Sequence, residues 1–258
     1  MLTVATANTH EGQLLTTPGG LQPFVDHGVD ALLLQEVHPL ETEQIVDILE
    51  DNGYMCAALE HAAGLAIAIA QDSPNIMNRG LIVEDTIGVA KRWETALAEV
   101  VPSIQPRIRP RSVVGLRLAL PAGAVVTVAT THPTVFVRHR SRKRQIEALS
   151  NVLGTAEFAG RLILGGDMNH YPGPHQVDDA LRAAHQLKRA RINEPTSEVT
   201  GSKHEFWARL GSRLTDRPLV DFDGSLDTLL HRGFRDTDGK VLPIASDHRA
   251  VVASFTPM

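Results

Sequence analysis

The sequence predicts an α/β protein in which two mixed β-sheets pack face to face and helices cover their outer sides. Short apolar runs such as Ala31–Gln35 and Leu162–Gly165 recur along the 258 residues. Runs that are apolar at consecutive positions are typical of strands covered on both faces. Helical patterns fall between these runs. A Pro-Ala-Gly sequence separates Ser112–Leu120 from Val125–Thr131, which predicts a tight turn between two paired strands.

Gly, Pro, Asp or Asn bound most of the apolar runs, and these residues favour turns. We find no internal repeat, low-complexity tract or linker rich enough to divide the chain. We therefore expect one domain over residues 1–258. In chain order, strands are expected at Leu2–Ala7, Ala31–Gln35, Met55–Leu59, Leu65–Ala70, Ser112–Leu120, Val125–Thr131, Leu162–Gly165, Ser225–Leu230 and Ala250–Phe255.

Three stretches between the strands have helical character. The clearest is Val137–Phe158, where apolar residues that include Leu149 and Leu153 recur at helical spacing. A second helix is expected after Pro39 and a third near His175–Arg189. Strands followed by helices favour mixed sheets with helices outside, and polar residues at strand ends then lie along one rim.

The composition is that of an ordinary soluble protein, with 43% hydrophobic and 21% charged residues. The net charge of −5 argues against strong nonspecific binding to nucleic acid, and favours small phosphorylated molecules or nucleotides. Cys56 is the only cysteine, which excludes an intramolecular disulfide. No secretion signal and no apolar run of about 20 residues is present. We expect a cytoplasmic protein without a membrane span, and nothing points to a partner protein.

Polar residues end several of the apolar runs. In each case an acid, an amide or an imidazole stands at the end of a rigid strand. Catalytic groups in such positions are held in a fixed geometry. These sequences are Asn8, Gln35-Glu36, Thr131-His132, Gly165-Gly166-Asp167-Met168-Asn169 and Ser246-Asp247-His248.

Each of these residues also has an ordinary structural interpretation when taken alone. Asn8 would form a turn, and Glu36 would be a solvated charge at a strand end. His132 precedes a proline and would be a loop histidine. The Gly-Gly-Asp-Met-Asn sequence would be a glycine-rich turn, since Asp and Asn accept left-handed backbone angles.

Taken in order, the motifs resemble the endonuclease/exonuclease/phosphatase family, whose members include deoxyribonucleases, abasic-site endonucleases, inositol phosphatases and sphingomyelinases. The resemblance runs from the first strand to the last. It implies a four-layer α/β/β/α sandwich and metal-dependent hydrolysis of phosphoester bonds. The motifs that carry it are Thr6-Ala7-Asn8, Leu34-Gln35-Glu36-Val37, Thr130-Thr131-His132-Pro133, Gly165-Gly166-Asp167-Met168-Asn169 and Ser246-Asp247-His248.

Phosphoester hydrolysis is slow because an anion repels the incoming hydroxide and an alkoxide must leave. A hard divalent cation held by oxygen ligands offsets both problems. Glu36 is the best candidate for a ligand, and Asn8 and Asp247 complete the predicted set. The lone Cys56 and the dispersed histidines disfavour structural zinc. Magnesium is the expected ion, with manganese as its substitute.

His248 is the predicted proton-transfer or charge-stabilising group, because an imidazole titrates near neutral pH. A carboxylate normally orients such a ring. The resemblance implies that this carboxylate is Asp227, and Asp223 is the alternative. Family members commonly carry an Arg-Ile-Asp-Tyr-like pattern here, whereas this chain has Ser225 and Thr228.

Asp167 is predicted to act on the attacking water or on the leaving oxygen, and the sequence does not choose between these roles. Asn169 and His132 would donate hydrogen bonds to the phosphate oxygens. Arg140 and Arg144 lie one helical turn apart. They form either a phosphate clamp, as forked guanidinium donors can, or a solvated helix face.

The sequence therefore predicts a phosphorylated substrate, and by analogy with the family a nucleic acid or a nucleotide ranks first. Two alternatives remain open. One is a lipid or inositol phosphatase, and the other is a binding module that kept the fold and lost catalysis. His10 and Glu11 would line the rim, although a plain loop is the simpler interpretation.

Overall fold

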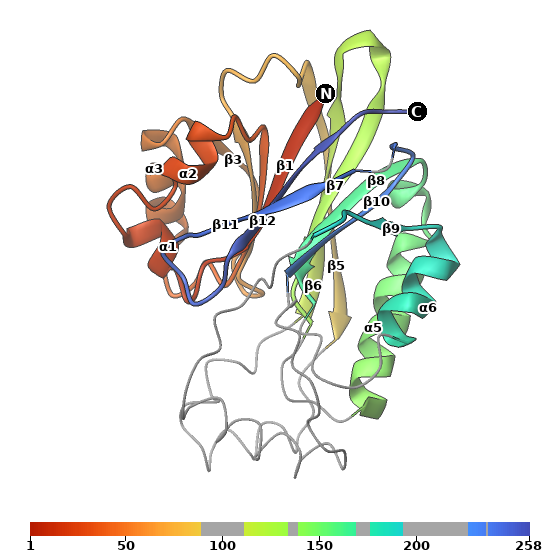
Figure 1. Cartoon of the computed structure of the whole chain (residues 1–258). Coiled ribbons are helices and arrows are strands. Elements are labelled where there is room, and N and C mark those ends of the chain that lie inside the picture. Colours follow the sequence, from red (N-terminus) through yellow and green to blue (C-terminus); the bar gives the residue numbers. More distant parts are fainter. Residues whose placement is uncertain (89–110, 134–138, 169–175, 193–226, 236) are drawn as a thin grey trace, which may run out of the picture.

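The structure is a computed structural model of the chain, and it describes residues 1–88, 111–133, 139–168, 176–192, 227–235 and 237–258. Two six-stranded β-sheets lie face to face, and helices lie against the outer side of each sheet (Figure 1). The predicted order of layers, α/β/β/α, is therefore confirmed. Among the described residues, no helix combines the length and the apolar character that crossing a bilayer requires.

The first sheet contains both ends of the chain. Strand β1 (Leu2–Asn8) pairs in parallel with β2 (Ala31–Gln35) and antiparallel with β12 (Ala250–Phe255). The last strand therefore lies beside the first. The strand order is β11 (Gly239–Leu242), β12, β1, β2, β4 (Leu65–Ala70) and β3 (Tyr54–Glu60).

The second sheet comes from the middle of the chain. Strand β7 (Val125–Thr131) pairs in parallel with β8 (Arg161–Asp167), and β8 pairs antiparallel with β10 (Asp227–Arg232). A short 3₁₀ turn, Pro121–Gly123, joins β7 to the preceding strand, as the hairpin prediction requires. The strand order is β5 (Asn78–Gly88), β6 (Arg111–Ala119), β7, β8, β10 and β9 (Lys188–Arg189).

Strand β2 shows why an uninterrupted apolar run suits this fold. Leu33 packs in the core between the two sheets, whereas Leu32 and Leu34 pack on the other face, with residues of the first helices. Side chains alternate between the faces of a strand, so burial of both faces demands an apolar residue at every position. Each fully buried leucine stabilises the fold by about 1.5–3 kcal/mol.

The helices cover the sheets through apolar faces. Helix α3 begins at a capping box, in which Glu41 and Gln44 each accept a hydrogen bond from the backbone of the other. Its Ile45 and Leu49 are buried against the first sheet. The helices of the first sheet are α1 (Gln13–Thr16), α2 (Gln22–Asp26) and α3 (Thr42–Asp51), and those of the second are α5 (His139–Leu153) and α6 (Gln176–His185).

All the predicted strands are present, with ends that shift by one or two residues. The start of the predicted Ser225 strand lies outside the described residues. The strands that the sequence did not predict are β5, β9 and β11, and all three lie at sheet edges. An edge strand is paired on one side only and carries more polar residues, so it lacks the continuous apolar run on which the prediction rested.

Two predicted helices were too long. The Val137–Phe158 pattern is helical in α5 only as far as Leu153, and a separate 3₁₀ turn covers Ala156–Phe158. The pattern near His175–Arg189 continues to Arg189 in the sequence, but α6 ends at His185. Gln186 then adopts a left-handed φ of 55°, which ends a right-handed helix. Lys188 and Arg189 pair with β10 instead.

Candidate active site

Strand pairing brings polar side chains to one edge of each sheet. Parallel β1 and β2 end together, at Asn8 and just before Glu36. Parallel β7 and β8 end in the same way, just before His132 and at Asp167. Strand β10 runs antiparallel to β8, so it begins at this edge, where Asp227 is the register partner of Asp167.

Asp167 lies at the centre of a buried polar cluster. Its Oδ2 accepts a hydrogen bond from Asn8 Nδ2 at 3.1 Å. The same oxygen lies 3.6 Å from His132 Nε2 and 3.8 Å from His248 Nε2. Glu36 Oε1 lies 3.8 Å from His132 Nε2. Residues from both sheets, distant in the sequence, therefore meet in one place.

His248 is held by a hydrogen bond between its Nδ1 and Asp227 Oδ2, at 2.7 Å. Asp227 is only 1% exposed. The backbone fixes the ring as well, because His248 N donates to Ser246 Oγ at 3.1 Å and Ser246 Oγ donates to Asn8 O at 2.9 Å. Asp227 therefore contacts the ring as the resemblance implies, whereas Asp223 lies outside the described residues.

Burial by itself lowers the pKa of His248, but the surrounding carboxylates more than offset this effect. The charges of Asp227, Asp167 and Asp247, together with the hydrogen bond to Asp227, raise the pKa from 6.5 to about 10. In the metal-free protein the imidazole is therefore protonated at neutral pH and is a donor at both nitrogens.

The raised pKa of His248 predicts a pH-dependent stability of the metal-free protein. The folded state binds the imidazole proton more tightly than the unfolded state. The stabilisation is therefore complete below pH 6.5, falls as the pH rises, and is lost above about pH 10. Thermal melts in EDTA should show a difference in Tm between wild type and His248→Gln that shrinks over this range. A difference that stays constant from pH 6 to 10.5 would contradict the prediction.

Glu36 occupies a strained backbone position at the site. Its φ is +57°, a region that residues other than glycine adopt uncommonly and often at functional sites. Thr9 Oγ1 donates to Glu36 O at 2.7 Å, and the Glu36 side chain remains 21% exposed. Thr9 therefore holds the backbone of Glu36 in place, and the carboxylate of Glu36 is partly exposed to solvent.

Gln35, whose role no sequence pattern indicated, links the two sheets beneath the cluster. Its Nε2 lies 3.1 Å from Thr6 Oγ1 in the first sheet and 2.8 Å from Thr130 Oγ1 in the second. All three side chains are fully buried. These contacts hold the ends of strands from both sheets at a fixed spacing.

Gly165 and Gly166 lie within β8 and do not form a turn. A Cβ on Gly165 would approach Leu33 Cδ1 to 2.6 Å, and a Cβ on Gly166 would approach Thr131 O to 2.0 Å. Both glycines are therefore required by close packing around β8. This packing, and not a flexible glycine-rich turn, positions Asp167 at the strand end.

Asp247 points to the rim of the cluster and contacts a histidine. Its Oδ1 lies 2.9 Å from His10 Nδ1 and 4.0 Å from His248 Nε2. The backbone N–H of His10 donates to Asn8 Oδ1 at 2.9 Å. The sequence offered two interpretations of His10, a residue that lines the rim and a plain loop residue, of which the loop was the simpler. The structure places it against two of the predicted metal ligands.

The donor set of the cluster fits a hard divalent cation. The carboxylates of Glu36, Asp167, Asp227 and Asp247 and the amide oxygen of Asn8 are the ligand types that Mg²⁺ takes. Ligand atoms of Asp167, Asp227 and His248 also lie within 4.8 Å of one another. We favour the oxygen ligands over this group for the ion, because His248 Nδ1 already hydrogen-bonds to Asp227.

Some predicted residues cannot be placed at the site. Asn169 lies outside the described residues, as does the side chain of Arg140, whose backbone is in the first turn of α5. Arg144 lies one turn further along α5 and is exposed. Gln145 beside it is 9% exposed.

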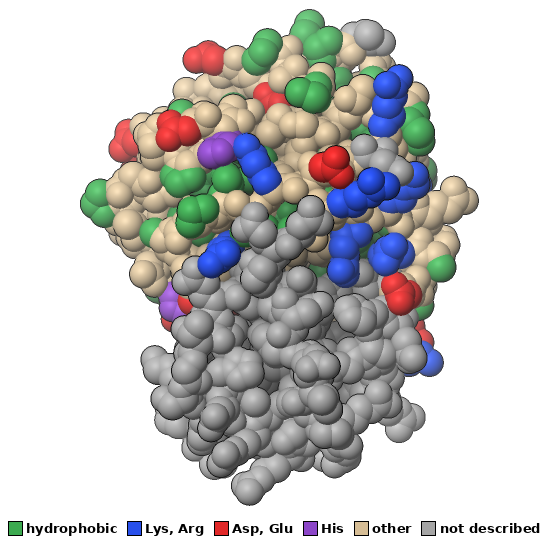
Figure 2. Space-filling model, viewed as in Figure 1, with side chains coloured by type: hydrophobic (Ala, Val, Ile, Leu, Met, Phe, Trp, Pro, Cys, Tyr) green, Lys and Arg blue, Asp and Glu red, His purple; other side chains and the backbone are tan. Residues whose placement is uncertain are grey.

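Lys and Arg side chains gather over the part of the second sheet that includes β9 and β10 (Figure 2). Because the whole chain carries a net charge of −5, this positive charge is local. Strand β10 runs away from Asp227, so its basic end lies towards the opposite edge from the cluster. The described Lys and Arg residues on β9 and β10 or within three residues of them are Lys188, Arg189, Arg191, Arg232 and Arg235.

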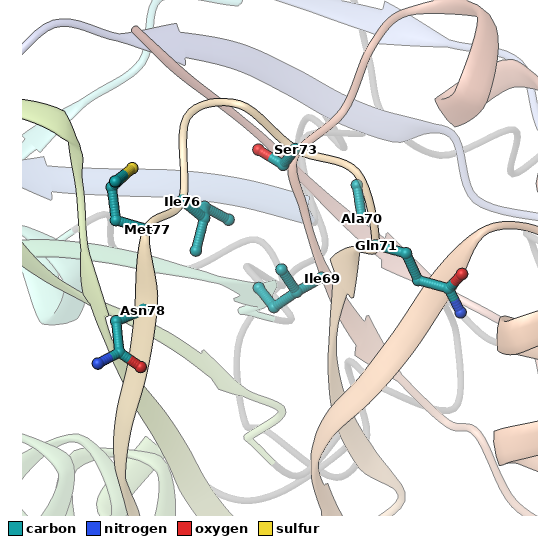
Figure 3. A pocket seen from close by; sticks show the side chains of 7 residues that line it. All are labelled: Ile69, Ala70, Gln71, Ser73, Ile76, Met77 and Asn78. Carbon is teal, nitrogen blue, oxygen red and sulfur yellow. The ribbon is translucent and has the colours of Figure 1, made fainter.

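A surface pocket at the other end of β4 is separate from the cluster (Figure 3). Leu65 pairs with Gln35 at the cluster edge, whereas Ala70 ends the strand on the far side. The pocket contains none of the candidate catalytic residues. Its lining consists of Ile69, Ala70, Gln71, Ser73, Ile76, Met77 and Asn78.

A model of the Endonuclease/Exonuclease/phosphatase family matches residues 5–248, which is most of the chain. The match includes every residue of the buried cluster. No curated protein matches the chain significantly.

Solved structures show the same fold. An endonuclease/exonuclease/phosphatase family protein from Bacteroides thetaiotaomicron is 16% identical, with a TM-score of 0.68 over 98% of this chain and 97% of that chain. A mannosyl-6-phosphatase from Bacteroides thetaiotaomicron VPI-5482 is 17% identical, with a TM-score of 0.66 over 99% of this chain and 100% of that chain. TDP2 from D. rerio, complexed with a single-strand DNA product, is 11% identical, with a TM-score of 0.63 over 99% of this chain and 98% of that chain.

Proposed function

This chain belongs to the endonuclease/exonuclease/phosphatase family, and we propose that it is a single-domain, divalent-metal-dependent hydrolase of phosphodiester or phosphomonoester bonds. The observation that carries the proposal is the cluster in which Asp167 Oδ2 contacts Asn8, His132 and His248. Ionised oxygens beside imidazole donors supply the ligands, the base and the anion-stabilising groups that phosphoester hydrolysis needs.

Glu36, Asn8 and Asp247 would hold the ion, which we propose to be Mg²⁺ with Mn²⁺ as a substitute. A bound ion would neutralise charge on the phosphate and favour ionisation of the attacking water. Asn8 is well placed for this role because its amide is already oriented. Nδ2 donates to Asp167, and Oδ1 accepts from His10 N while keeping a second lone pair.

Asp167 is the proposed acceptor of the proton from the attacking water, which approaches phosphorus in line with the leaving oxygen. Asn8 Nδ2 donates to its carboxylate, and the imidazoles of His132 and His248 lie within 4 Å. Asp167 Oδ2 is therefore an acceptor in this structure, as a base must be, so we favour this role over protonation of the leaving oxygen.

His248 and His132 are the proposed donors to the phosphate oxygens. Asp227 holds the His248 ring with Nε2 directed towards Asp167. His132 Nε2 lies between Glu36 and Asp167, where it can stabilise developing negative charge. Asn169, Arg140 and Arg144 would add further contacts to the phosphate.

Hydrolysis of bis(p-nitrophenyl) phosphate tests the proposal. We expect turnover with Mg²⁺ or Mn²⁺, loss of turnover with excess EDTA, and recovery when the ion is restored. Circular dichroism before and after EDTA controls for unfolding. An unchanged rate in EDTA would contradict metal dependence. Ion binding without hydrolysis of any tested ester would indicate a binding module instead.

We propose a nucleotide or a nucleic acid in the cytoplasm as the substrate. TDP2, with its DNA product, supports this class through the shared fold. The mannosyl-6-phosphatase is the more similar of these two neighbours, with 17% identity against 11% and a TM-score of 0.66 against 0.63. The net charge of −5 also favours a small substrate. Rates on DNA, RNA, nucleotides, sugar phosphates, phosphoinositides and sphingomyelin, measured at equal ester concentration, would distinguish these classes.

A further inference from the structure

We propose that a basic surface along β9 and β10 binds the backbone of a nucleic acid strand whose scissile ester lies in the cluster. The substrate is then a strand of several nucleotides and not a free nucleotide. This inference rests on the proposed function, because it names the substrate class of the same site. The basic surface consists of Lys188, Arg189, Arg191, Arg232 and Arg235.

Positive charge is concentrated in this part of the chain. Residues 186–192 and 228–235 include all five cations of the basic surface and contain no Asp or Glu. Lys188, Arg191 and Arg235 are exposed, and Figure 2 shows Lys and Arg side chains gathered in this region. Asp238, whose backbone pairs with Arg191, lies at the border. A local concentration of cations is the feature that binds a phosphate backbone, even when the whole chain is acidic.

The strand register arranges these cations along β10. Asp227 begins this strand at the edge of the cluster, and Arg232 ends it on the far side. Lys188 pairs with His231, close to the far end. Strand β9 runs antiparallel to β10, so Arg191 lies further back towards the cluster. The basic surface therefore extends from the far edge of the second sheet towards the candidate active site.

Arg232 is held in place by neutral acceptors. Its Nε donates to Gly160 O at 2.8 Å, its Nη1 to His185 O at 3.0 Å, and its Nη2 to Phe158 O at 2.6 Å. Carbonyl groups fix the guanidinium without neutralising its charge. A cation that is already fixed loses less conformational entropy when it binds a phosphate, so this arrangement favours binding of an anion.

The length of β10 sets the length of strand that can reach both places. A β-strand rises about 3.3 Å per residue, so Asp227 and Arg232 are separated by about 17 Å. Stacked nucleotides advance about 3.4 Å each along one strand. A strand with its scissile ester in the cluster therefore meets the far end of the basic surface about five nucleotides away. A free nucleotide is too short to contact both.

Fluorescence anisotropy of the full-length protein tests the inference, with fluorescein-labelled single-stranded DNA of about 20 and of about three nucleotides at several NaCl concentrations. EDTA is present throughout, so that binding is measured without turnover. The variants are the triple replacement Lys188→Gln/Arg191→Gln/Arg235→Gln and the single replacement Arg235→Gln. The control is Lys143→Gln, because Lys143 is 65% exposed on α5 and pairs with Glu147. Melting curves show whether each variant is folded.

We expect wild type to bind the longer strand more tightly than the shorter one. The triple variant should bind the longer strand about 10-fold or more weakly, and its slope of log affinity against log salt should be shallower by about 2, because each lost phosphate contact removes about 0.7. Arg235→Gln should show a smaller loss in the same direction, and Lys143→Gln should show none.

Three results would overturn the inference. One is equal affinity of wild type for both lengths, and another is unchanged binding of the longer strand in the triple variant. If the triple variant is unfolded, Arg235→Gln decides, and unchanged binding there has the same meaning. The third is binding to phosphatidylserine vesicles without binding to DNA, which would assign the basic surface to a lipid membrane.

Rates on bis(p-nitrophenyl) phosphate with Mg²⁺ separate this inference from the proposed function. This diester is too small to extend from the cluster to the end of the basic surface, so the triple variant should keep the wild-type kcat and KM. On the longer strand, KM should rise and kcat should change little. Wild type that fails to hydrolyse any tested ester would contradict the proposed function. Wild-type hydrolysis of the diester, with DNA binding that the triple variant retains, would overturn only the role of the basic surface.

Discussion

Replacing Asp227 by Asn is expected to lower kcat by about 10³–10⁴-fold with little change in KM. Asp227 Oδ2 contacts His248 Nδ1 at 2.7 Å and is the nearest of the charges that keep this ring protonated. Asparagine preserves the size of the side chain but supplies no charge. In the Ser-His-Asp triad the same replacement lowers kcat by about 10⁴-fold. Here the expected cause is loss of the charge that keeps His248 protonated as a donor to the phosphate.

Steady-state kinetics on the activated diester measure this effect, with Asp223→Asn as the matched control. Asp223 is the carboxylate that the sequence alone offered as the alternative partner. Its replacement should leave kcat close to wild type. A large loss in Asp223→Asn together with a small loss in Asp227→Asn would reverse the assignment. Melting curves of both variants separate a catalytic loss from a folding defect.

Replacing Glu36 by Gln is expected to abolish metal-dependent turnover, with a loss on the order of 10³-fold or more. Metal ions supply several kcal/mol of transition-state stabilisation, and each 1.36 kcal/mol corresponds to a factor of ten in rate. Glutamine retains an oxygen ligand but removes the negative charge that attracts the ion. The backbone of Glu36 is held by Thr9 and should not change.

Glu50→Gln controls for the loss of one negative charge, because Glu50 is exposed in the last turn of α3 on the outer face of the molecule. It should retain wild-type rates. Titration calorimetry with Mg²⁺ should show weakened binding in Glu36→Gln and unchanged binding in Glu50→Gln. Full activity in Glu36→Gln would refute the assignment of this residue to the metal.

Sequence patterns predicted the interior of the fold well because burial leaves a clear signal. Central strands such as β2 and β8 lie in mixed sheets covered on both faces, so they appear as apolar runs. Edge strands β5, β9 and β11 do not need such runs and were not predicted. The end of α6 was missed for a similar reason, since the left-handed φ of Gln186 is a property of the backbone and not of the residue type.

In the candidate site, too, some features were predictable from the sequence and others only from the structure. The order of the motifs and the strand-end position of each polar residue were available from the sequence. The contact between Asp227 and His248 was implied by resemblance, and the structure provides the distance. Gln35 was identified only as a polar residue at a strand end and His10 only as a rim or loop residue, because a glutamine in a strand and a histidine in a loop are ordinary. Their contacts with residues far away in the sequence give them a place in the site.

The sequence by itself determined which segments form the core and which polar residues end the strands, because apolar periodicity and strand termini are local properties. Only the tertiary structure decided which side chains meet. The pairing of β12 with β1 and the packing of one sheet on the other bring His248 and Asp227 to within hydrogen-bonding distance. Contacts of this kind depend on strand order and on the spacing between the sheets, and these are set by the packing of the whole chain.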